Sequence, residues 1–290
     1  MKKLFAVVSL PVLLFLCACG GGSSAPKPAA TADGAVMQVV EALNENNAAG
    51  PWHMLPAGYQ SELNSVKTAF AEKLDAEVYN GGADLVAKLG SVLKTKMKLI
   101  LANPMLQGVP MRSELESNYD HLVTVLGILG TSEYASLEGL KTTGIGEFLT
   151  STGSELMEAA SRMEISDESP KPMGMNSMMK VPGQVLNLQA ELVSEEGDSA
   201  VVKLTTEGEE PEEMTFVRVE GKWIPEELAK DFPEMIEQMR KSVAEFEMTP
   251  QMKSQALMGI NMANRLLDQI ASAETQEELQ VALGGVLGGL

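Results

Sequence analysis

The sequence predicts a mostly helical α+β fold with one small antiparallel β-meander, at about residues 184–225, packed against helices. Two observations lead to this prediction. Over most of the first 165 residues, apolar side chains recur at steps of three and four, which is the period of an amphipathic helix. After residue 184 the period changes to two, which is typical of strands with one buried face.

The helical region spans residues 33–165. Asp33 is the expected N-cap of its first helix, and the proline-bracketed segment Pro51–Pro56 is expected to be a turn. Asn80-Gly81-Gly82 is expected to end the second helix. The predicted helical stretches are about 33–43, 59–78, 84–101, 115–129, 133–140 and 145–163.

The meander begins with the alternation of Leu186, Leu188, Ala190 and Leu192 with polar residues. Glu220-Gly221 is a tight-turn signal between the last two strands. A small sheet needs cover on its apolar face, and helices before and after it in sequence supply that cover. The remaining expected elements are strands at 200–206, 214–219 and 222–224, helices at 232–246 and 250–271, and a short closing turn capped by Thr275.

The first residues form a signal-like stretch. Two lysines precede an apolar run over residues 4–16, which is too short to remain as a membrane-spanning helix. Leu16-Cys17-Ala18-Cys19 follows and resembles the lipobox of bacterial lipoproteins. The resemblance implies a signal peptide over residues 1–18, lipid on Cys19, and a flexible Gly/Ser/Pro-rich tether over residues 19–32. Cys17 is the poorer acceptor because Leu16 and Phe15 before it are too large for the peptidase.

The implied location is the cell envelope, with the domain in the periplasm or at the cell surface. If the cell has an outer membrane, Gly20 after the cysteine resembles the default sorting signal to it. The formal net charge is −18, and cleavage removes two lysines, so the mature chain is still more acidic. Such a chain lacks the basic patch that binds phosphates, which excludes nucleic acid as a partner. Membrane attachment therefore depends on the acyl chains.

A second resemblance lies in the predicted meander. Phe216-Val-Arg-Val-Glu-Gly-Lys-Trp-Ile-Pro225 is similar to the last hairpin of bacterial envelope proteins of the nuclear-transport-factor-2-like group, and the similarity extends over Val181–Pro225. It implies a cone-shaped α+β domain with a pocket, a scaffold that serves both enzymes and binding modules. About 60 residues of predicted helix follow the sheet here, whereas that fold usually ends on its sheet.

Residues 166–183 have no periodicity and are expected to form a Met/Pro-rich loop. The segment 184–290, with the meander and the C-terminal helices, is expected to pack with 33–165 as one domain. Within the loop, Met173, Met175, Met178 and Met179 offer soft thioethers that suit Cu(I). Methionine is abundant throughout the chain and fills gaps in packing, so the sequence favours packing over a metal site.

Few side chains in the sequence point to catalysis. The two histidines, His53 and His121, have no metal-ligand spacing, so the chain is expected to be no enzyme and to need no cofactor. Trp52, Tyr59 and Trp223 are candidates to line a groove. The expected function is a binding or structural role in the envelope, toward an envelope protein or a small apolar ligand. The alternatives are a small-molecule-binding or enzymatic cone-fold domain, and copper handling through methionines.

Overall fold

The structure is a computed structural model that describes residues 27–103, 112–163, 187–206 and 210–287. The lipobox with Cys19 and the four methionines Met173, Met175, Met178 and Met179 lie outside these residues, so their roles stay predictions. The described helices are α2 (Ala32–Asn44), α3 (Ala49–Met54), α4 (Ala57–Lys73), α5 (Ala76–Leu101), α6 (Arg112–Thr131), η2 (Glu133–Ala135), α7 (Leu137–Thr142), α8 (Ile145–Phe148), η3 (Leu149–Gly153), α9 (Ser154–Ser161), α10 (Glu226–Glu245), α11 (Pro250–Ser272) and α12 (Gln276–Leu287). The strands are β1 (Leu188–Glu196), β2 (Ser199–Thr206), β3 (Glu212–Val219) and β4 (Lys222–Pro225).

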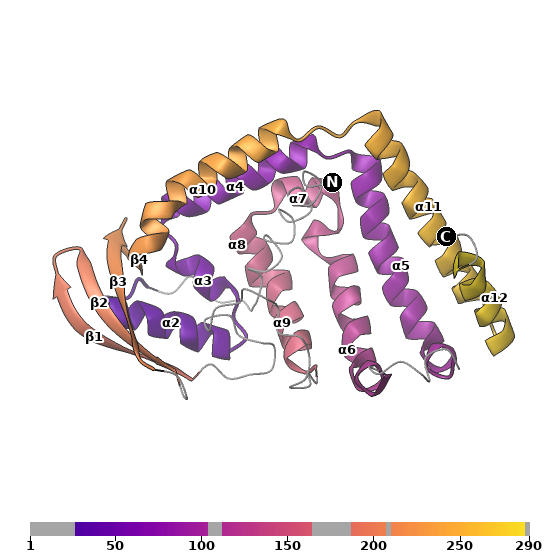
Figure 1. Cartoon of the computed structure of the whole chain (residues 1–290), viewed down its shortest axis with the longest axis horizontal. Helices are drawn as coiled ribbons and strands as arrows, with labels where there is room; N and C mark the ends of the chain where they lie inside the picture. Colours follow the sequence, from indigo (N-terminus) through magenta and orange to yellow (C-terminus); the bar gives the residue numbers. More distant parts are fainter. Residues whose placement is uncertain (1–26, 104–111, 164–186, 207–209, 288–290) are drawn as a thin grey trace. The chain divides into compact units, whose positions relative to one another are not determined.

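The predicted fold class is confirmed: helices dominate, and the four strands form one antiparallel sheet in the order β1-β2-β3-β4 (Figure 1). The chain divides into two compact units, each assembled from separated segments. Unit 1 contains the described residues 27–73, 141–158, 187–206 and 210–247. Unit 2 contains 74–103, 112–140, 159–163 and 248–287. That all segments pack as one domain stays a prediction.

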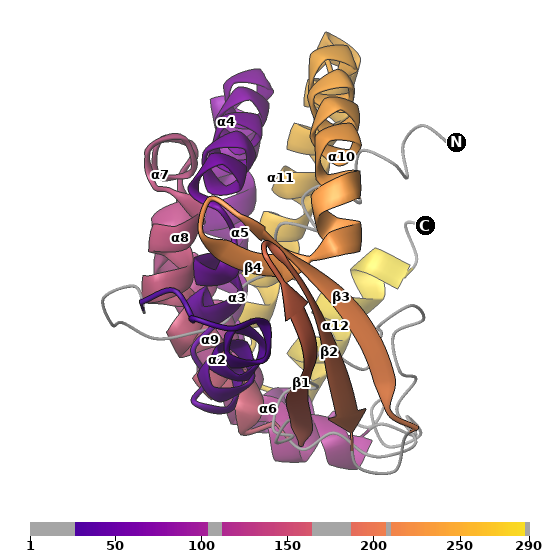
Figure 2. The ribbon, with the colours of Figure 1, turned by 90° about the vertical axis from the view of Figure 1, so that its left-hand side faces the viewer.

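In unit 1, helix α2 packs against one face of the sheet (Figure 2). Alternate residues of β2 point to that face and are buried, as the period of two requires. Trp223 of β4 lies in the same cluster, and its Nε1 donates a hydrogen bond to the carbonyl oxygen of Ala30 at 3.3 Å. The buried cluster consists of Ala32, Ala35, Val36, Val40, Ala200, Val202, Leu204, Phe216 and Trp223.

The hairpin between β3 and β4 closes at Glu220-Gly221, as predicted. Both residues have positive φ angles, 50° and 75°, which is what the commonest two-residue hairpin turn needs. The Glu220 carboxylate accepts a hydrogen bond from the amide of Gly58 at 2.9 Å, in the first turn of α4. This contact satisfies one of the orphan N–H groups of α4 and fixes the hairpin against it.

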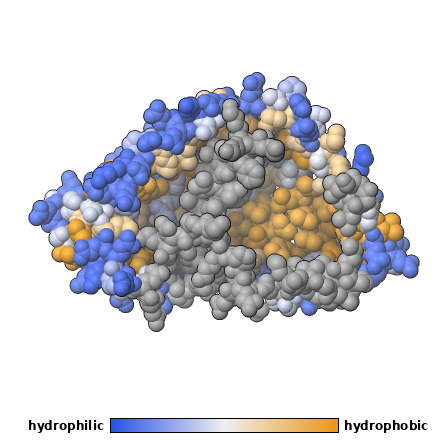
Figure 3. Space-filling view, viewed as in Figure 1, coloured by the Kyte–Doolittle hydropathy of each residue, from blue (hydrophilic) through white to orange (hydrophobic). Residues whose placement is uncertain are grey.

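Helices α4 and α10 lie side by side in unit 1. The rings of Tyr59 and Phe232 stack with 3.6 Å between their centroids, and Glu62 and Arg240 form an ion pair. Helix α10 buries Phe232, Ile236 and Val243, while Figure 3 shows hydrophilic side chains along its outer side. This is the expected distribution for a surface helix with one apolar stripe.

Unit 2 is a helical assembly in which α6, α11 and α12 each contact α5. Its α5–α6 contact is close because both helices carry glycines there: a Cβ on Gly130 would lie only 2.8 Å from the Cα of Ala87. Ion pairs join α11 to α5 and to its N-cap residue, with Lys88 at 2.8 Å from Asp268 and Lys253 at 2.9 Å from Asp75. The buried apolar cluster consists of Val92, Leu267, Ile270, Ala273, Leu279 and Ala282.

The structure corrects the predicted break in the second helix. The chain does not stop at Asn80-Gly81-Gly82; it breaks earlier, and α5 begins at Ala76. Asp75 is the cause, because its Oδ1 accepts hydrogen bonds from the amides of Glu77 and Val78, at 3.0 and 3.2 Å. The two glycines lie inside α5, where a Cβ on Gly81 would touch the side chain of Ile260 on α11.

Three smaller expectations are also corrected. The segment expected to be a proline-bracketed turn is mostly helix α3, in which Pro51 occupies the first turn, a position where proline is tolerated. Thr31, not Asp33, is the N-cap of α2, and Asp33 lies in its first turn. The closing turn after Thr275 is the 12-residue helix α12, begun by reciprocal hydrogen bonds between Thr275 and Glu278.

Candidate binding groove in unit 1

A groove of about 630 Å³ opens on unit 1, where α3 and the first half of α4 meet α8 and η3. It has a wide mouth, and its volume lies within the range of about 300–1,000 Å³ that is usual for small-molecule sites. Its lining residues are Trp52, His53, Gln60, Asn64, Gly144, Gly146, Glu147, Thr150 and Ser151.

Trp52 is the aromatic residue of the groove. It belongs to the short helix α3 and is 8% exposed. Its indole lies against Gly146, at the start of α8, so closely that a Cβ at that position would overlap the ring nitrogen. Gly146 is therefore needed for this packing. Among the described residues, no hydrogen bond engages the indole N–H, which leaves a donor at the edge of the groove.

Two amide side chains of α4 hold the walls together. Gln60 Nε2 donates to the carbonyl oxygens of Trp52, at 2.8 Å, and of Leu55, at 3.1 Å, so it fixes the end of α3 to α4. Asn64 Oδ1 accepts the amide N–H of Ile145 at 2.8 Å. That N–H is an orphan donor at the start of α8, and its pairing brings α8 against α4 across 81 residues of sequence.

A buried lysine, Lys67 of α4, also holds the segment that leads into α8. Lys67 on α4 is 3% exposed, and its Nζ donates to the carbonyl oxygen of Thr143 at 2.6 Å. A longer contact of 3.5 Å reaches the carbonyl oxygen of Lys141. Burial lowers the pKa of Lys67, and the negative charge of Glu147 acts in the opposite direction. The ammonium thus anchors the segment that leads into α8.

The floor on the other side is η3, one turn of π-helix between α8 and α9. Thr150 Oγ1 donates to the carbonyl oxygen of Gly146 at 2.7 Å, and Ser151 Oγ donates to that of Glu147 at 3.0 Å. Single π-turns inside helices occur frequently at functional sites. Here the turn places two hydroxyl groups on the groove, with their hydrogens directed to the backbone.

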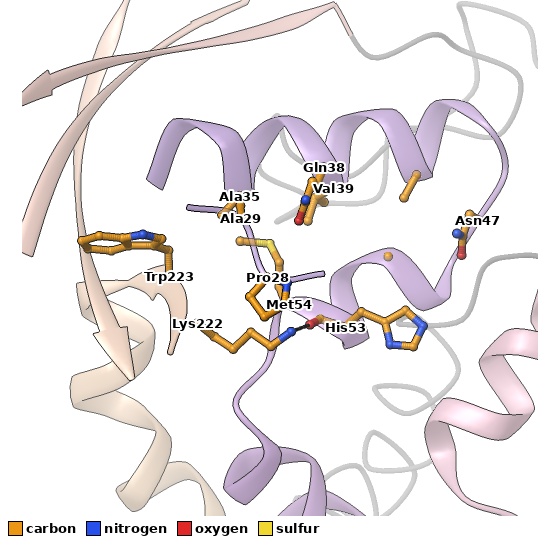
Figure 4. A pocket seen from close by; sticks show the side chains of 12 residues that line it. Pro28, Ala29, Ala35, Gln38, Val39, Asn47, His53, Met54, Lys222 and Trp223 are labelled. Carbon is orange, nitrogen blue, oxygen red and sulfur yellow. Dashed lines mark hydrogen bonds between the residues drawn. The ribbon is translucent and has the colours of Figure 1, made fainter. Parts of the chain in front are cut away.

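His53 lies between the groove and a second, much smaller pocket. Burial lowers the pKa of its imidazole, and the positive charge of Lys222 lowers it further. Lys222 Nζ donates to the carbonyl oxygen of His53 at 3.0 Å, and Figure 4 shows the imidazole directed away from that ammonium. At neutral pH His53 is therefore mostly uncharged.

The second pocket lies between α2, α3 and β4, and Trp223, Lys222 and Met54 are among its lining residues (Figure 4). Its volume is about 40 Å³, which holds a few water molecules at most. A ligand of ordinary size does not fit, so the groove is the candidate site.

No known family matches. Comparison of the chain with models of protein families, with curated proteins and with solved structures finds no similarity in any of the three. The two resemblances seen in the sequence, to bacterial lipoproteins and to the nuclear-transport-factor-2-like group, therefore stay predictions.

The structure separates the three aromatic residues that were predicted to share a groove. Trp52 lines the groove, Tyr59 stacks on Phe232, and Trp223 is 2% exposed in the core beside the small pocket. Sequence reasoning missed Gln60 and Asn64, which are polar positions on a helix with no motif around them.

In the described part of the chain, no three His, Cys, Asp or Glu side chains gather closely enough to hold a metal ion. No helix within the same ranges has both the length and the apolar character needed to cross a membrane.

Proposed function

We propose that the protein is a lipoprotein of the bacterial cell envelope, attached to a membrane by lipid on Cys19, and that it acts by binding a ligand in the groove of unit 1. The apolar run, the lipobox-like Leu16–Cys19 and the Gly/Ser/Pro-rich stretch after it support the attachment. The outer membrane is the proposed destination where one exists, because Gly20 follows the cysteine.

The observation that supports binding is the groove itself, with its suitable volume and mixed lining. Its titratable lining residues are His53 and Glu147, and neither hydrogen-bonds the other or activates a neighbouring hydroxyl. Thr150 and Ser151 donate to backbone carbonyls, so they are engaged in structure. These features favour recognition over acid–base or nucleophilic chemistry.

Attachment is tested by substituting each cysteine of the signal region separately. Cys19→Ser should move the protein from the membrane fraction to the soluble fraction, because the acylated thiol is the proposed anchor. Cys17→Ser is the matched control and should leave the distribution unchanged. Cell fractionation with immunoblotting measures both, and equal partition of Cys19→Ser and the wild type would refute the proposal.

Binding is tested with the small-molecule fraction of the producing cell's own envelope. A ligand that binds only the folded state raises the melting temperature. We expect this fraction to raise it for the wild type but not for Gly146→Ala, whose added methyl group displaces the Trp52 indole. Gly259→Ala is the control, because a Cβ there meets no atom within 4 Å. A shift of the same size in Gly146→Ala would exclude the groove as the site.

A further inference from the structure

We infer that the ligand of the groove is a neutral, hydroxyl-rich molecule, of the class of short oligosaccharides. The inference rests on the proposed binding function and narrows it to one chemical class. It follows from which hydrogen-bonding groups of the groove remain available, from the balance of charge around it, and from its shape.

The available groups are mainly acceptors. Gln60 Nε2 donates its hydrogens to the carbonyl oxygens of Trp52 and Leu55, so its Oε1 remains available to accept a hydrogen bond from a ligand. Thr150 donates its hydroxyl hydrogen to the backbone, so its oxygen offers only lone pairs. The exposed carboxylate of Glu147 is also an acceptor. A ligand that fits this lining must carry several hydrogen-bond donors.

The groove also presents a donor and a group of both kinds. The indole N–H of Trp52 is a donor without a partner among the described residues. The neutral imidazole of His53 carries one N–H and one acceptor nitrogen. Hydroxyl groups both donate and accept, so a polyhydroxylated ligand matches this mixture, whereas an ammonium or guanidinium group donates only and a carboxylate accepts only.

Charge distinguishes the remaining classes. In the described part of the chain, no Lys or Arg lines the groove, and Glu147 would repel an anionic ligand. The Glu147 carboxylate would attract a cationic ligand, but the buried ammonium of Lys67 lies close enough to interact with that carboxylate. The two fixed charges offset one another, so the site gains little from a ligand of either sign. A neutral ligand carries no desolvation cost for a charge of its own.

The shape favours a chain over a compact molecule. The groove has a wide mouth and a volume of about 630 Å³, so an oligosaccharide can lie along it with its ends in solvent. The positions of α3 and α8 against α4 are fixed by the Gln60 and Asn64 hydrogen bonds. A prearranged site of this kind loses little entropy on binding.

The test is isothermal titration calorimetry on the full-length protein in detergent. The probes are three neutral tetrasaccharides (maltotetraose, cellotetraose and chitotetraose), with spermidine and citrate as the cationic and anionic comparators. We expect at least one tetrasaccharide to bind with a Kd at or below about 1 mM. We expect neither spermidine nor citrate to bind in that range.

Three variants test the site and the charge of its ligand. Gly146→Ala should weaken the tetrasaccharide by about tenfold or more, equivalent to about 1.4 kcal/mol, while Gly259→Ala should leave it unchanged. Glu147→Gln keeps an acceptor oxygen, so a neutral ligand should lose less than about tenfold, whereas a cationic ligand would lose its attraction. Circular dichroism checks that each variant is folded. If Gly146→Ala does not fold, the response of each probe to Glu147→Gln, and competition between the probes, still decide whether the ligand is neutral or cationic.

Each other outcome overturns the inference in a recognisable way. Spermidine binding that Glu147→Gln abolishes would make the ligand cationic and would leave the proposed binding function intact. Tetrasaccharide binding that Gly146→Ala does not weaken would place the sugar elsewhere on the chain. Failure of every tetrasaccharide, with a melting shift still produced by the envelope fraction, would refute the sugar class alone. If no tetrasaccharide binds and the envelope fraction produces no melting shift, the proposed binding function is refuted as well.

Discussion

Substitution of Trp223 by alanine tests whether the sheet and α2 share one core. The indole is 2% exposed and packs in the cluster that includes Val36, Val202 and Phe216. Truncation of a buried tryptophan to alanine typically costs about 3–5 kcal/mol. The carbonyl of Ala30 also loses its indole donor, which adds about 1 kcal/mol if water does not replace it. The adjacent pocket of about 40 Å³ lets water enter, so we expect a total near 4 kcal/mol.

The assay is urea denaturation followed by tryptophan fluorescence. The chain has two tryptophans, Trp52 and Trp223, and both belong to unit 1, so the signal reports the unfolding of that unit. In Trp223→Ala the remaining signal comes from Trp52. Trp223→Phe is the matched control, because it keeps most of the apolar volume and should cost about 1–2 kcal/mol. A loss below about 1 kcal/mol for Trp223→Ala would refute the described core.

Three further predictions concern glycine packing and pH. Gly130→Ala should destabilise unit 2 by about 1–3 kcal/mol, because the added Cβ would clash with the α5 backbone. Gly127→Ala, on the same helix, is the control: its Cβ meets no atom within 4 Å, so it should stabilise the unit slightly. Thermal unfolding followed by circular dichroism compares the two variants. The hydrogen bond from Lys253 lowers the pKa of Asp75 below its ordinary 3.8, so the contribution of Asp75 to stability is complete above about that pH and is lost as the pH falls through the lowered value. Hydrogen exchange of α5 amides should show this acid loss in the wild type and not in Asp75→Asn. Burial lowers the pKa of His53 below 6.5, so protonating this imidazole costs the folded state more than the unfolded state. The stability of unit 1 should therefore be complete above about pH 6.5 and fall as the pH drops below it. In urea denaturation, the midpoints of His53→Gln should not show this fall.

The fold class was predictable because its signals are local. The alternation of Leu188, Ala190 and Leu192 with polar residues is visible in the sequence, and in β1 these residues are half-buried and alternate with exposed ones. The Glu220-Gly221 turn was predictable because glycine there allows a positive φ. The break before α5 was not predictable, because Asp75 has the character of an ordinary helix-surface residue. Only the structure shows that its carboxylate accepts hydrogen bonds from the amides of Glu77 and Val78.

The groove was much less predictable. Trp52 was identified because aromatic residues are few, but nothing in the sequence connects Asn64 with Ile145, whose contact depends on the tertiary fold. The burial of Lys67 was hidden as well, because an isolated lysine on a predicted helix is normally assigned to the surface. Nothing in the sequence shows why residue 146 is glycine; the structural reason is the Trp52 indole that lies against it.

The division of unit 1 into separated segments has a consequence for the order in which the chain folds. Val36 of α2 buries its side chain against strands that lie more than 150 residues later, so while the chain emerges from N- to C-terminus α2 has the short helix α3 beside it but not the sheet. Helices α5 and α6, by contrast, are consecutive and contact each other directly, so they form a hairpin of low contact order. The α5–α6 hairpin can therefore form early, whereas the cluster between α2 and the sheet is complete only once Trp223 is present.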